Sequence, residues 1–330
     1  MPPEWARHER TLMAWPCRRE LWGGQLAAAK GESAGVANAV AAFEPVTMVA
    51  GSADDAAEAR AACSAAVEVL ELPIDDSWLR DSGPIFVVDD ADRPARRVGV
   101  HWGFNAWGDK FEGYANDQAV GGVLAERLGD VTTAPMVLEG GSIVVDGTGT
   151  LVTTEQCLLH PNRNPQLGRE QIEQHLRDYL GVERIVWLRQ GLVEDRDTDG
   201  HVDLIAAFVA PGRLLLQSTP AGTQNHDNML ENRRIAEAAG LEVLDFPTLA
   251  YASVDGEETV ASYMNFYMGD RFVVVPTAGQ PDRDEEALAR LREVFAGKEV
   301  VGVPGVVHAF GGGGPHCITQ QVPALARGAR

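Results

Sequence analysis

The feature that most constrains the fold is a polar side chain that repeatedly stands just ahead of an apolar run. Such positions recur along the chain at intervals of roughly 50 to 65 residues, a spacing typical of a repeat architecture. They are Asp81, Glu139, His201 with Asp203, Asn265 and Cys317. The spacing predicts five modules of similar length, each led by a polar group.

Each module contains a helical pattern followed by a short β-branched run. Ala, Leu and charged residues recur at three- and four-residue steps, which indicates amphipathic helices. The helical segments are residues 25–43, 55–66, 115–128, 168–180, 226–240 and 283–296, and the strands that follow them are 46–50, 67–72, 131–137, 183–188, 241–246 and 299–303. No low-complexity linker divides the chain, so we predict an α/β fold in a single domain of residues 1–330.

The last module is short, because Cys317 lies close to the end of the sequence. Residues 11–15, the helix at 25–43 and the strand at 46–50 would supply its missing parts. The two ends of the chain are therefore expected to share one module and to close a ring. The helix at 55–66 and the strand at 67–72 are left over, and the count of modules gives them no place beyond a connection across that ring.

Cys317 follows four consecutive glycines, which lack Cβ atoms and let the backbone approach a ligand closely. Residues 300–326 contain no Asp, Glu, Lys or Arg, so this segment is expected to be enclosed by the rest of the fold. Its prolines and glycines would interrupt a membrane-spanning helix. A thiol in such a place is either a nucleophile or a packed small hydrophobe.

The net charge of the chain limits the classes of molecule that it is expected to bind. The formal net charge is −20, which repels nucleic acid and anionic membranes and attracts a small cationic substrate. The polar N-terminus lacks the pattern of a signal peptide, so we expect a cytoplasmic protein. The four cysteines show no metal-binding or disulfide spacing, and neither a dinucleotide nor a nucleoside triphosphate motif occurs. We therefore expect no metal and no cofactor.

A ring of modules would gather Asp81, Glu139, His201, Asp203 and Cys317 at one central point. A cysteine and a histidine can form an activated nucleophile and its base, and a glutamate can orient the histidine. Two aspartates can hold a planar, delocalised cation through paired hydrogen bonds. Each residue alone could equally cap a turn.

The sequence resembles the agmatine deiminases of the guanidine-modifying pentein superfamily, the Porphyromonas-type peptidyl-arginine deiminase family, over essentially its whole length. The segments that carry the resemblance are Met1-Pro-Pro-Glu-Trp5 with Met13-Ala-Trp-Pro16, Asp75-Asp-Ser-Trp-Leu-Arg-Asp-Ser-Gly-Pro84, Phe104-Asn-Ala-Trp-Gly108, Leu138-Glu-Gly-Gly-Ser-Ile143, Thr153-Thr-Glu-Gln-Cys-Leu-Leu159 with Pro161-Asn-Arg-Asn-Pro165, Thr198-Asp-Gly-His-Val-Asp203, Ser262-Tyr-Met-Asn-Phe-Tyr267 and Gly312-Gly-Gly-Pro-His-Cys-Ile-Thr-Gln-Gln321. The resemblance implies a five-bladed α/β propeller with pseudo-fivefold symmetry and a site on its axis.

The resemblance also implies roles for the leading residues. Cys317 would be the nucleophile, His201 the acid and base, and Glu139 the partner of His201. Asp81 and Asp203 would hold the guanidinium group.

Three further residues concern the pocket around that guanidinium. By the resemblance, Trp78 would form its aromatic wall. Asp197 stands where the family usually carries Glu, and with Asp199 it belongs to an acidic run just ahead of His201. This run would line the mouth of the pocket and receive a second positive charge, or it is a solvated loop.

The expected reaction is hydrolysis of agmatine to N-carbamoylputrescine and ammonia through a covalent amidino-cysteine, in the pathway from agmatine to putrescine and the polyamines. The alternatives are deimination of another guanidine, such as peptidyl arginine or a natural-product precursor, and a guanidine-binding protein without catalysis. The sequence leaves the length of the substrate tail and the formation of a homo-oligomer open.

Overall fold

The computed structural model describes residues 1–90 and 95–325, and it has the α/β fold predicted from the sequence. The end of the uncharged stretch, Ala326, lies outside the described residues, as do the last positions of the predicted domain. Within the described ranges, no helix is both long enough and apolar enough to cross a membrane.

Sheets with the same strand order recur along the chain. In each, two antiparallel strands are followed by a helix and by a third strand that runs parallel to the second. The sets are β4 (Ile85–Asp89), β5 (Arg96–Gly103), α6 (Ala115–Leu128) and β6 (Asp130–Val137); β7 (Ile143–Val145), β8 (Thr150–Thr154), α8 (Arg169–Leu180) and β9 (Arg184–Leu188); β10 (Ala206–Ala210), β11 (Arg213–Gln217), α9 (His226–Ala238) and β12 (Glu242–Phe246); and β15 (Tyr267–Met268), β16 (Phe272–Thr277), α10 (Pro281–Val294) and β17 (Glu299–Pro304). The predicted order of helix and strand is confirmed in each of these sets.

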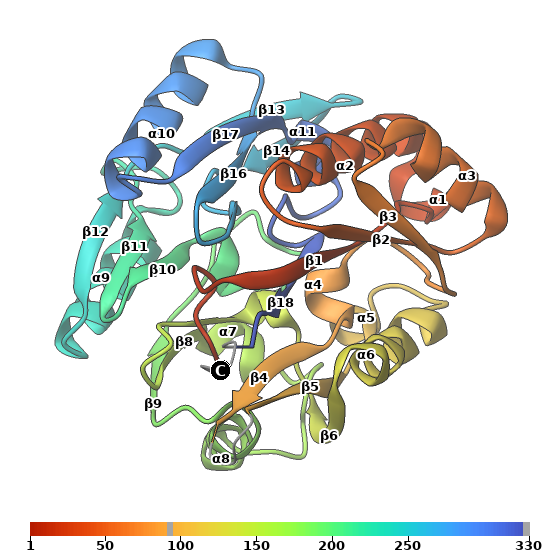
Figure 1. Cartoon of the computed structure of the whole chain (residues 1–330). Coiled ribbons are helices and arrows are strands. Elements are labelled where there is room, and N and C mark those ends of the chain that lie inside the picture. The colour runs from red at the N-terminus through yellow and green to blue at the C-terminus, as the bar shows by residue number, and fades with distance from the viewer. Residues whose placement is uncertain (91–94, 326–330) are drawn as a thin grey trace.

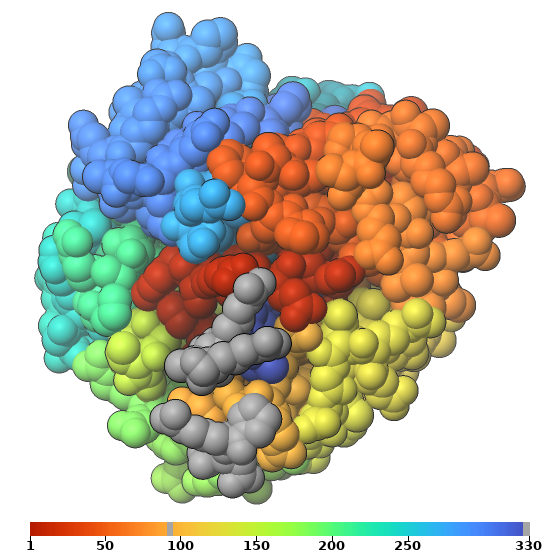
Figure 2. All heavy atoms as spheres, viewed as in Figure 1, coloured from red at the N-terminus to blue at the C-terminus, as the bar shows by residue number. Residues whose placement is uncertain are grey.

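One further sheet is built from both ends of the chain. Strand β18 (Thr319–Pro323) pairs antiparallel with β1 (His8–Ala14), and β1 pairs parallel with β2 (Val46–Ala50) after helix α2 (Leu26–Ala41). The sequence prediction that the two ends share one module is confirmed. In Figure 1 the longer helices, such as α6, α8, α9 and α10, lie toward the outside of the molecule, while β1 and β18 lie near the middle of the view. Figure 2 shows the N-terminal residues, in red, at the centre of the same face.

Residues 51–74, for which the count of modules had no place beyond a connection across a ring, extend this sheet instead. Helix α3 (Ala53–Ala62) begins after Ser52, whose hydroxyl oxygen accepts a hydrogen bond from the backbone N–H of Asp55. The chain then returns as β3 (Val67–Glu71), which pairs parallel with β2. Adding β3 satisfies the backbone groups that β2 would otherwise leave unpaired at the sheet edge.

The core shows why these segments adopt their structures. Helix α8 buries Ile172, Leu176 and Leu180 at four-residue steps and ends at Gly181, whose φ of 66° is left-handed. Strand β16 is buried on both faces from Phe272 to Pro276, which explains its continuous apolar run. Truncation of a buried leucine such as Leu176 to alanine is expected to cost about 2 to 5 kcal/mol of stability.

The remaining elements are short. A hairpin of β13 (Ala250–Val254) and β14 (Glu257–Ala261) lies outside the repeated pattern and turns at Asp255 and Gly256, both with positive φ. The others are α1 (Arg19–Trp22), η1 (Gly23–Gln25), α4 (Leu79–Ser82), α5 (Ala106–Asp109), η2 (Gly140–Ser142), α7 (Glu155–Leu158), η3 (Val202–Leu204) and α11 (Val306–Phe310). Several of these short helices carry or adjoin the polar residues that lead the modules.

Candidate active site

The predicted site residues lie in the turns that precede the first strand of each module. Asp81 lies on α4 ahead of β4, His201 and Asp203 lie at η3 ahead of β10, and Cys317 lies ahead of β18. All are buried. Cys317 Sγ lies 3.4 Å from Asp203 Oδ2, and His201 Nδ1 lies 3.9 Å from Asp81 Oδ2. Residues far apart in the sequence therefore meet at one point, as predicted.

Gly141 lies at the centre of this group. A Cβ atom built at this position would lie 2.7 Å from His201 Nδ1, 2.8 Å from Asp203 Oδ2 and 3.0 Å from Asp81 Oδ1. Only glycine leaves room for the imidazole and both carboxylates to face the same point. These three side chains and the Cys317 thiol form the reactive group of the candidate site.

Asp81 is held by neutral donors. Trp107 Nε1 donates to its Oδ2 and the backbone N–H of Gly141 donates to its Oδ1, both at 2.9 Å. Burial raises the pKa of Asp81, and the hydrogen bond from Trp107 offsets only part of that rise. Asp81 therefore carries its negative charge at a cost in solvation.

Asp203 has a histidine partner instead. His316 Nδ1 lies 2.8 Å from Asp203 Oδ2, while Oδ1 has no hydrogen-bond partner among residues 1–90 and 95–325. Burial alone would raise the pKa of Asp203, but the hydrogen bond and the charge of His316 lower it below its ordinary value. Asp203 thus stays ionised and keeps one oxygen free.

The thiol of Cys317 is buried against these acids. Asn265 Nδ2 lies 3.2 Å from Sγ, and Gly313 packs so closely that a Cβ there would lie 2.8 Å from Sγ. Burial raises the pKa of Cys317 well above its ordinary value, and the carboxylates of Asp203 and Asp81 raise it further. A positive charge between the carboxylates would oppose this effect.

His201 and Glu139 are both fully buried. Glu139 Oε1 accepts a hydrogen bond from Arg163 Nε at 2.5 Å, whereas Glu139 Oε2 and both ring nitrogens of His201 have no partner in the described part of the chain. Glu139 was predicted to be the partner of His201. The hydrogen bond that the structure gives it goes to Arg163 instead.

Glu139, His201 and Cys157 place ligand-type atoms within 4.8 Å of one another. The Arg163 guanidinium bound to Glu139 puts a positive charge beside this group, and that charge opposes a metal cation. We assign no metal to it.

A narrow cavity leads to Cys317. Its walls include the rings of Trp78, Trp107 and Phe111, so Trp78 lies where the prediction put it. Trp78 stacks on Trp22 with ring centroids 5.6 Å apart. A Cβ at Gly311 would lie 2.5 Å from the Trp22 ring, so the glycine run admits these rings as well as a ligand. The full lining is Leu21, Trp78, Asp81, Trp107, Phe111, Asp197, Thr198, Gly311, Gly312 and Cys317.

The acidic residues ahead of His201 make different contacts. Asp197 lines the cavity, and desolvation together with the neighbouring Asp195 raises its pKa. Asp199 pairs instead with Lys110 Nζ at 2.8 Å and with Arg163 at 2.7 Å. Burial would raise the pKa of Asp199, but hydrogen bonds from Asn162, Lys110 and Arg163 lower it to about 2. The structure thus places Asp197, but not Asp199, where the prediction put both.

Asp195 has a structural task in the same run. Its carboxylate accepts hydrogen bonds from the backbone N–H groups of Thr198, Gly200 and His201, at 2.9 to 3.0 Å. These bonds fix the loop that presents the His201 imidazole.

A family model of Porphyromonas-type peptidyl-arginine deiminases matches residues 1–323. The chain belongs to this family. It is 43% identical to an agmatine deiminase of Stutzerimonas stutzeri and 43% identical to one of Pseudomonas aeruginosa, each over 98% of this chain and 95% of the relative. The solved structure of Enterococcus faecalis agmatine deiminase matches with a TM-score of 0.92 and 33% identity, over 99% of this chain and 96% of that one.

Several residues of this family member contact the site but were not predicted to belong to it. Trp107 binds Asp81, Arg163 binds Glu139, Asn265 contacts Cys317, and His316 binds Asp203. All of them lie in the segments that carry the family resemblance. Those segments were the available signal for Trp107, Arg163 and His316, whereas Asn265 was also marked by its place at the head of a module.

Proposed function

We propose that this chain hydrolyses the guanidinium group of agmatine, giving N-carbamoylputrescine and ammonia. The observation that carries the proposal is the meeting of an imidazole and two carboxylates around Gly141, with the Cys317 thiol 3.4 Å from Asp203 at the end of a cavity lined in part by aromatic rings. The full-length similarity to agmatine deiminases supports it.

The carboxylates of Asp81 and Asp203 bind the guanidinium group and fix its carbon near Cys317. Charge-assisted N–H···O bonds hold a planar cation in one orientation, which converts the attack into a reaction within a complex. The bound cation also favours the Cys317 thiolate, because it offsets the two negative charges that raise the pKa of the thiol.

Cys317 then serves as the nucleophile. Its thiolate forms a C–S bond to the guanidinium carbon, and a C–N bond breaks as His201 gives a proton to the departing ammonia. The amidino-thioether that remains is the covalent intermediate. His201 next takes a proton from water, the water oxygen bonds to the same carbon, and the C–S bond breaks to release the ureido product and the thiolate. Glu139 lies close enough to stabilise the imidazolium that forms.

Trp78 and Asp197 serve the rest of the substrate. The Trp78 ring covers the alkyl chain, and the Asp197 carboxylate attracts the amine at the far end of agmatine. A solved structure of C. jejuni agmatine deiminase carries a cysteine-to-serine change and has substrate bound; it is 26% identical to this chain and has a TM-score of 0.89.

Acid trapping tests the covalent step. Wild-type protein quenched in acid during turnover of agmatine should show the mass of an added amidine on the peptide that contains Cys317. Cys63→Ala is the matched control, because Cys63 lies outside the site, and it should give the same adduct. An adduct on another cysteine, or turnover without any adduct, would exclude this assignment.

Ammonia release tests the substrate. Agmatine, arginine, peptidyl arginine and a neutral alkylguanidine of equal length should be compared at equal concentrations. Agmatine is expected to be the best. A preference for one of the others would leave a guanidine deiminase of different specificity, and binding without ammonia release would leave a binding protein.

The proposal extends to the architecture: the sheets of repeated construction are the blades of a five-bladed α/β propeller, and residues 1–330 form one catalytic domain. The support is the shared strand order, the sheet made from both chain ends, and the contacts of β18 with β4 and of β7 with β10. An experimental structure in which the modules superimpose by equal successive rotations about one axis would establish it. Thermal unfolding in a single cooperative step would support the single domain.

A further inference from the structure

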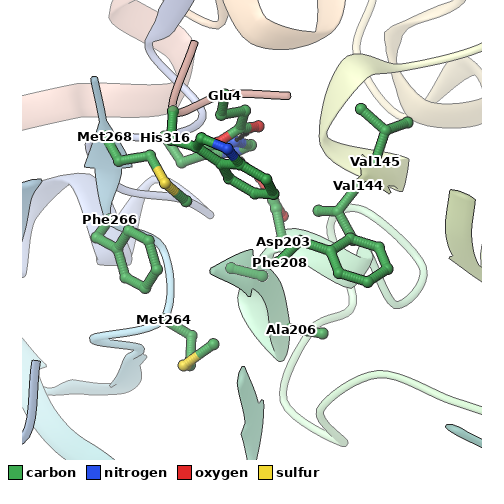
Figure 3. Close-up of a pocket in the computed structure, with 12 residues that line it drawn as sticks. Glu4, Val144, Val145, Asp203, Ala206, Phe208, Met264, Phe266, Met268 and His316 are labelled. Carbon is green, nitrogen blue, oxygen red and sulfur yellow. Dashed lines mark hydrogen bonds and ion pairs between the residues drawn. The ribbon is translucent and has the colours of Figure 1, made fainter. Parts of the chain in front are cut away.

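Asp203 borders a second narrow cavity, whereas Cys317 and Asp81 border the cavity described above. Figure 3 shows Glu4, His316 and Asp203 in line in this second cavity, with Met264, Phe266 and Met268 on one side and Val144 and Val145 on the other. The polar residues of this line are buried within an apolar surrounding, so their hydrogen bonds and charges act at low dielectric.

The hydrogen bonds of His316 define its protonation. Its Nδ1 lies 2.8 Å from Asp203 Oδ2, and its Nε2 lies 2.8 Å from Glu4 Oε1. A neutral imidazole has only one N–H, so one of these contacts would then set a nitrogen lone pair against a carboxylate oxygen. An imidazolium donates to both carboxylates and removes that conflict.

The charges around His316 favour the imidazolium. Burial and the charge of Arg80 lower the pKa of His316, but Glu4 and Asp203 outweigh them and raise it. Burial would raise the pKa of Glu4, yet His316 and, more weakly, Arg80 lower it to about 2. Both carboxylates thus remain ionised, with the cation between them.

These groups form a row of alternating charge that ends at the active site. The guanidinium of Arg80 lies 3.8 Å from Glu4 Oε1, and the row continues through His316 to Asp203. The substrate guanidinium would be the next cation in the row. Arg80 also donates to the backbone oxygen of His316 at 3.2 Å, which ties the row to the turn that carries Cys317.

We propose that His316 and Glu4 are positioning residues for deimination: the His316 imidazolium, fixed by Glu4, holds Asp203 as a carboxylate with Oδ1 free for the substrate. This inference rests on the proposed function. It gives the N-terminal segment a part in the chemistry, because Glu4 reaches His316 from the opposite end of the chain.

His316→Gln is the first test, since the glutamine amide can still donate to Asp203 but carries no charge. KM for agmatine should rise about 10- to 100-fold while kcat changes by less than about threefold, because Asp203 binds a cation in both the ground and transition states. Without the imidazolium Asp203 takes up a proton more readily, so the acid limb of kcat/KM should become steeper and move to higher pH. His175→Gln on α8, a partly buried histidine that lines neither cavity, is the matched control and should leave both parameters unchanged.

Glu4→Gln is the second test and covers the case in which His316→Gln fails to fold. Loss of the Glu4 charge lowers the pKa of His316, so the imidazolium is lost as the pH rises, and KM should increase toward alkaline pH. Glu71→Gln, on the exposed end of β3, is its control.

The direct readout is the agmatine affinity of Cys317→Ser, alone and combined with each change, measured by calorimetry across pH. The proposal is overturned if kcat falls with KM and the pH profile unchanged in both variants, which is the pattern of a merely structural role. If the wild type releases no ammonia from agmatine, the proposed function fails instead, and the same affinities should be measured with the guanidine that is turned over.

Discussion

The carboxylates of Asp81 and Asp203 both face Gly141, yet their surroundings shift their pKa values in opposite directions. Neutral N–H groups hold Asp81, and burial raises its pKa. A histidine paired with a second carboxylate holds Asp203, and its pKa is lowered. Two carboxylates that face the same point are therefore not favoured as anions by the same means.

Under the proposed function, this difference separates the two acids in time. Asp203 would be ionised before the substrate binds, because its pKa is lowered, whereas the bound guanidinium would help Asp81 to remain ionised. Because the pKa of Asp81 is raised, it is the first of the pair to take up a proton as the pH falls. We expect the acid limb of kcat/KM to follow Asp81.

The largest effect on kcat is expected for a variant that separates substrate binding from the chemical step. Cys317→Ser should lower kcat by about 10⁴-fold or more, because a serine hydroxyl without its own base is a far weaker nucleophile. Both carboxylates remain, so calorimetry should still detect agmatine binding. Loss of binding together with activity would show that the thiol itself holds the substrate.

The next effect compares the two acids directly. Asp81→Asn and Asp203→Asn should each cost about 3 kcal/mol of transition-state stabilisation, since each removes a charge-assisted partner of a desolvated cation. Asp81→Asn should flatten the acid limb of kcat/KM, whereas Asp203→Asn should retain it. Identical pH profiles would end the distinction between them.

Thermal unfolding of the same variants adds a second readout. Asp203→Asn leaves the His316 charge without one of its carboxylate partners, so it should lower Tm more than Asp81→Asn does. The reverse order of Tm values would contradict the role assigned to the charged row.

A smaller effect probes the neutral donors of Asp81. Trp107→Phe removes the N–H that lowers the pKa of Asp81, so the acid limb should move to higher pH, with a loss of about 1 kcal/mol in kcat/KM at neutral pH. Trp102→Phe is the matched control, because the buried Trp102 Nε1 has no hydrogen-bond partner in the described structure. A shift of equal size in the control would point to packing rather than to the hydrogen bond.

The smallest effect concerns a third carboxylate on the same cavity. Asp197→Asn should raise KM for agmatine about two- to fivefold and leave KM for a neutral alkylguanidine unchanged, because a partly solvated charge contributes weakly. Asp199→Asn should lower Tm instead, since Lys110 and Arg163 lose a shared partner. An unchanged agmatine KM in Asp197→Asn would remove the basis for a tail-binding role.

The features that could be predicted from the sequence are those that recur at regular intervals along it. The spacing from Asp81 to Cys317 anticipated the modules, and the apolar periodicity located helices such as α8 within a residue or two. The resemblance supplied the roles of the site residues. The module spacing and the family motifs can both be recognised from the order of residues along the chain alone.

The failures arise where a partner lies far away in the sequence. No local pattern indicated that β3 would extend the sheet of β2, that Arg163 would bind Glu139, or that Asp199 would be neutralised by Lys110 and Arg163. The choice between these contacts is made by tertiary packing, which brings a cation to one acid of the run and leaves another facing the cavity.

The sheet shared by both chain ends has a consequence for how the protein is made. Strand β18, next to Cys317, must find β1 across roughly 300 residues, and contacts of such separation form late and slowly. During synthesis, β1 must wait without its antiparallel neighbour until Thr319–Pro323 have left the ribosome. Under the proposed function, Cys317 therefore cannot take its place in the site before this late pairing forms.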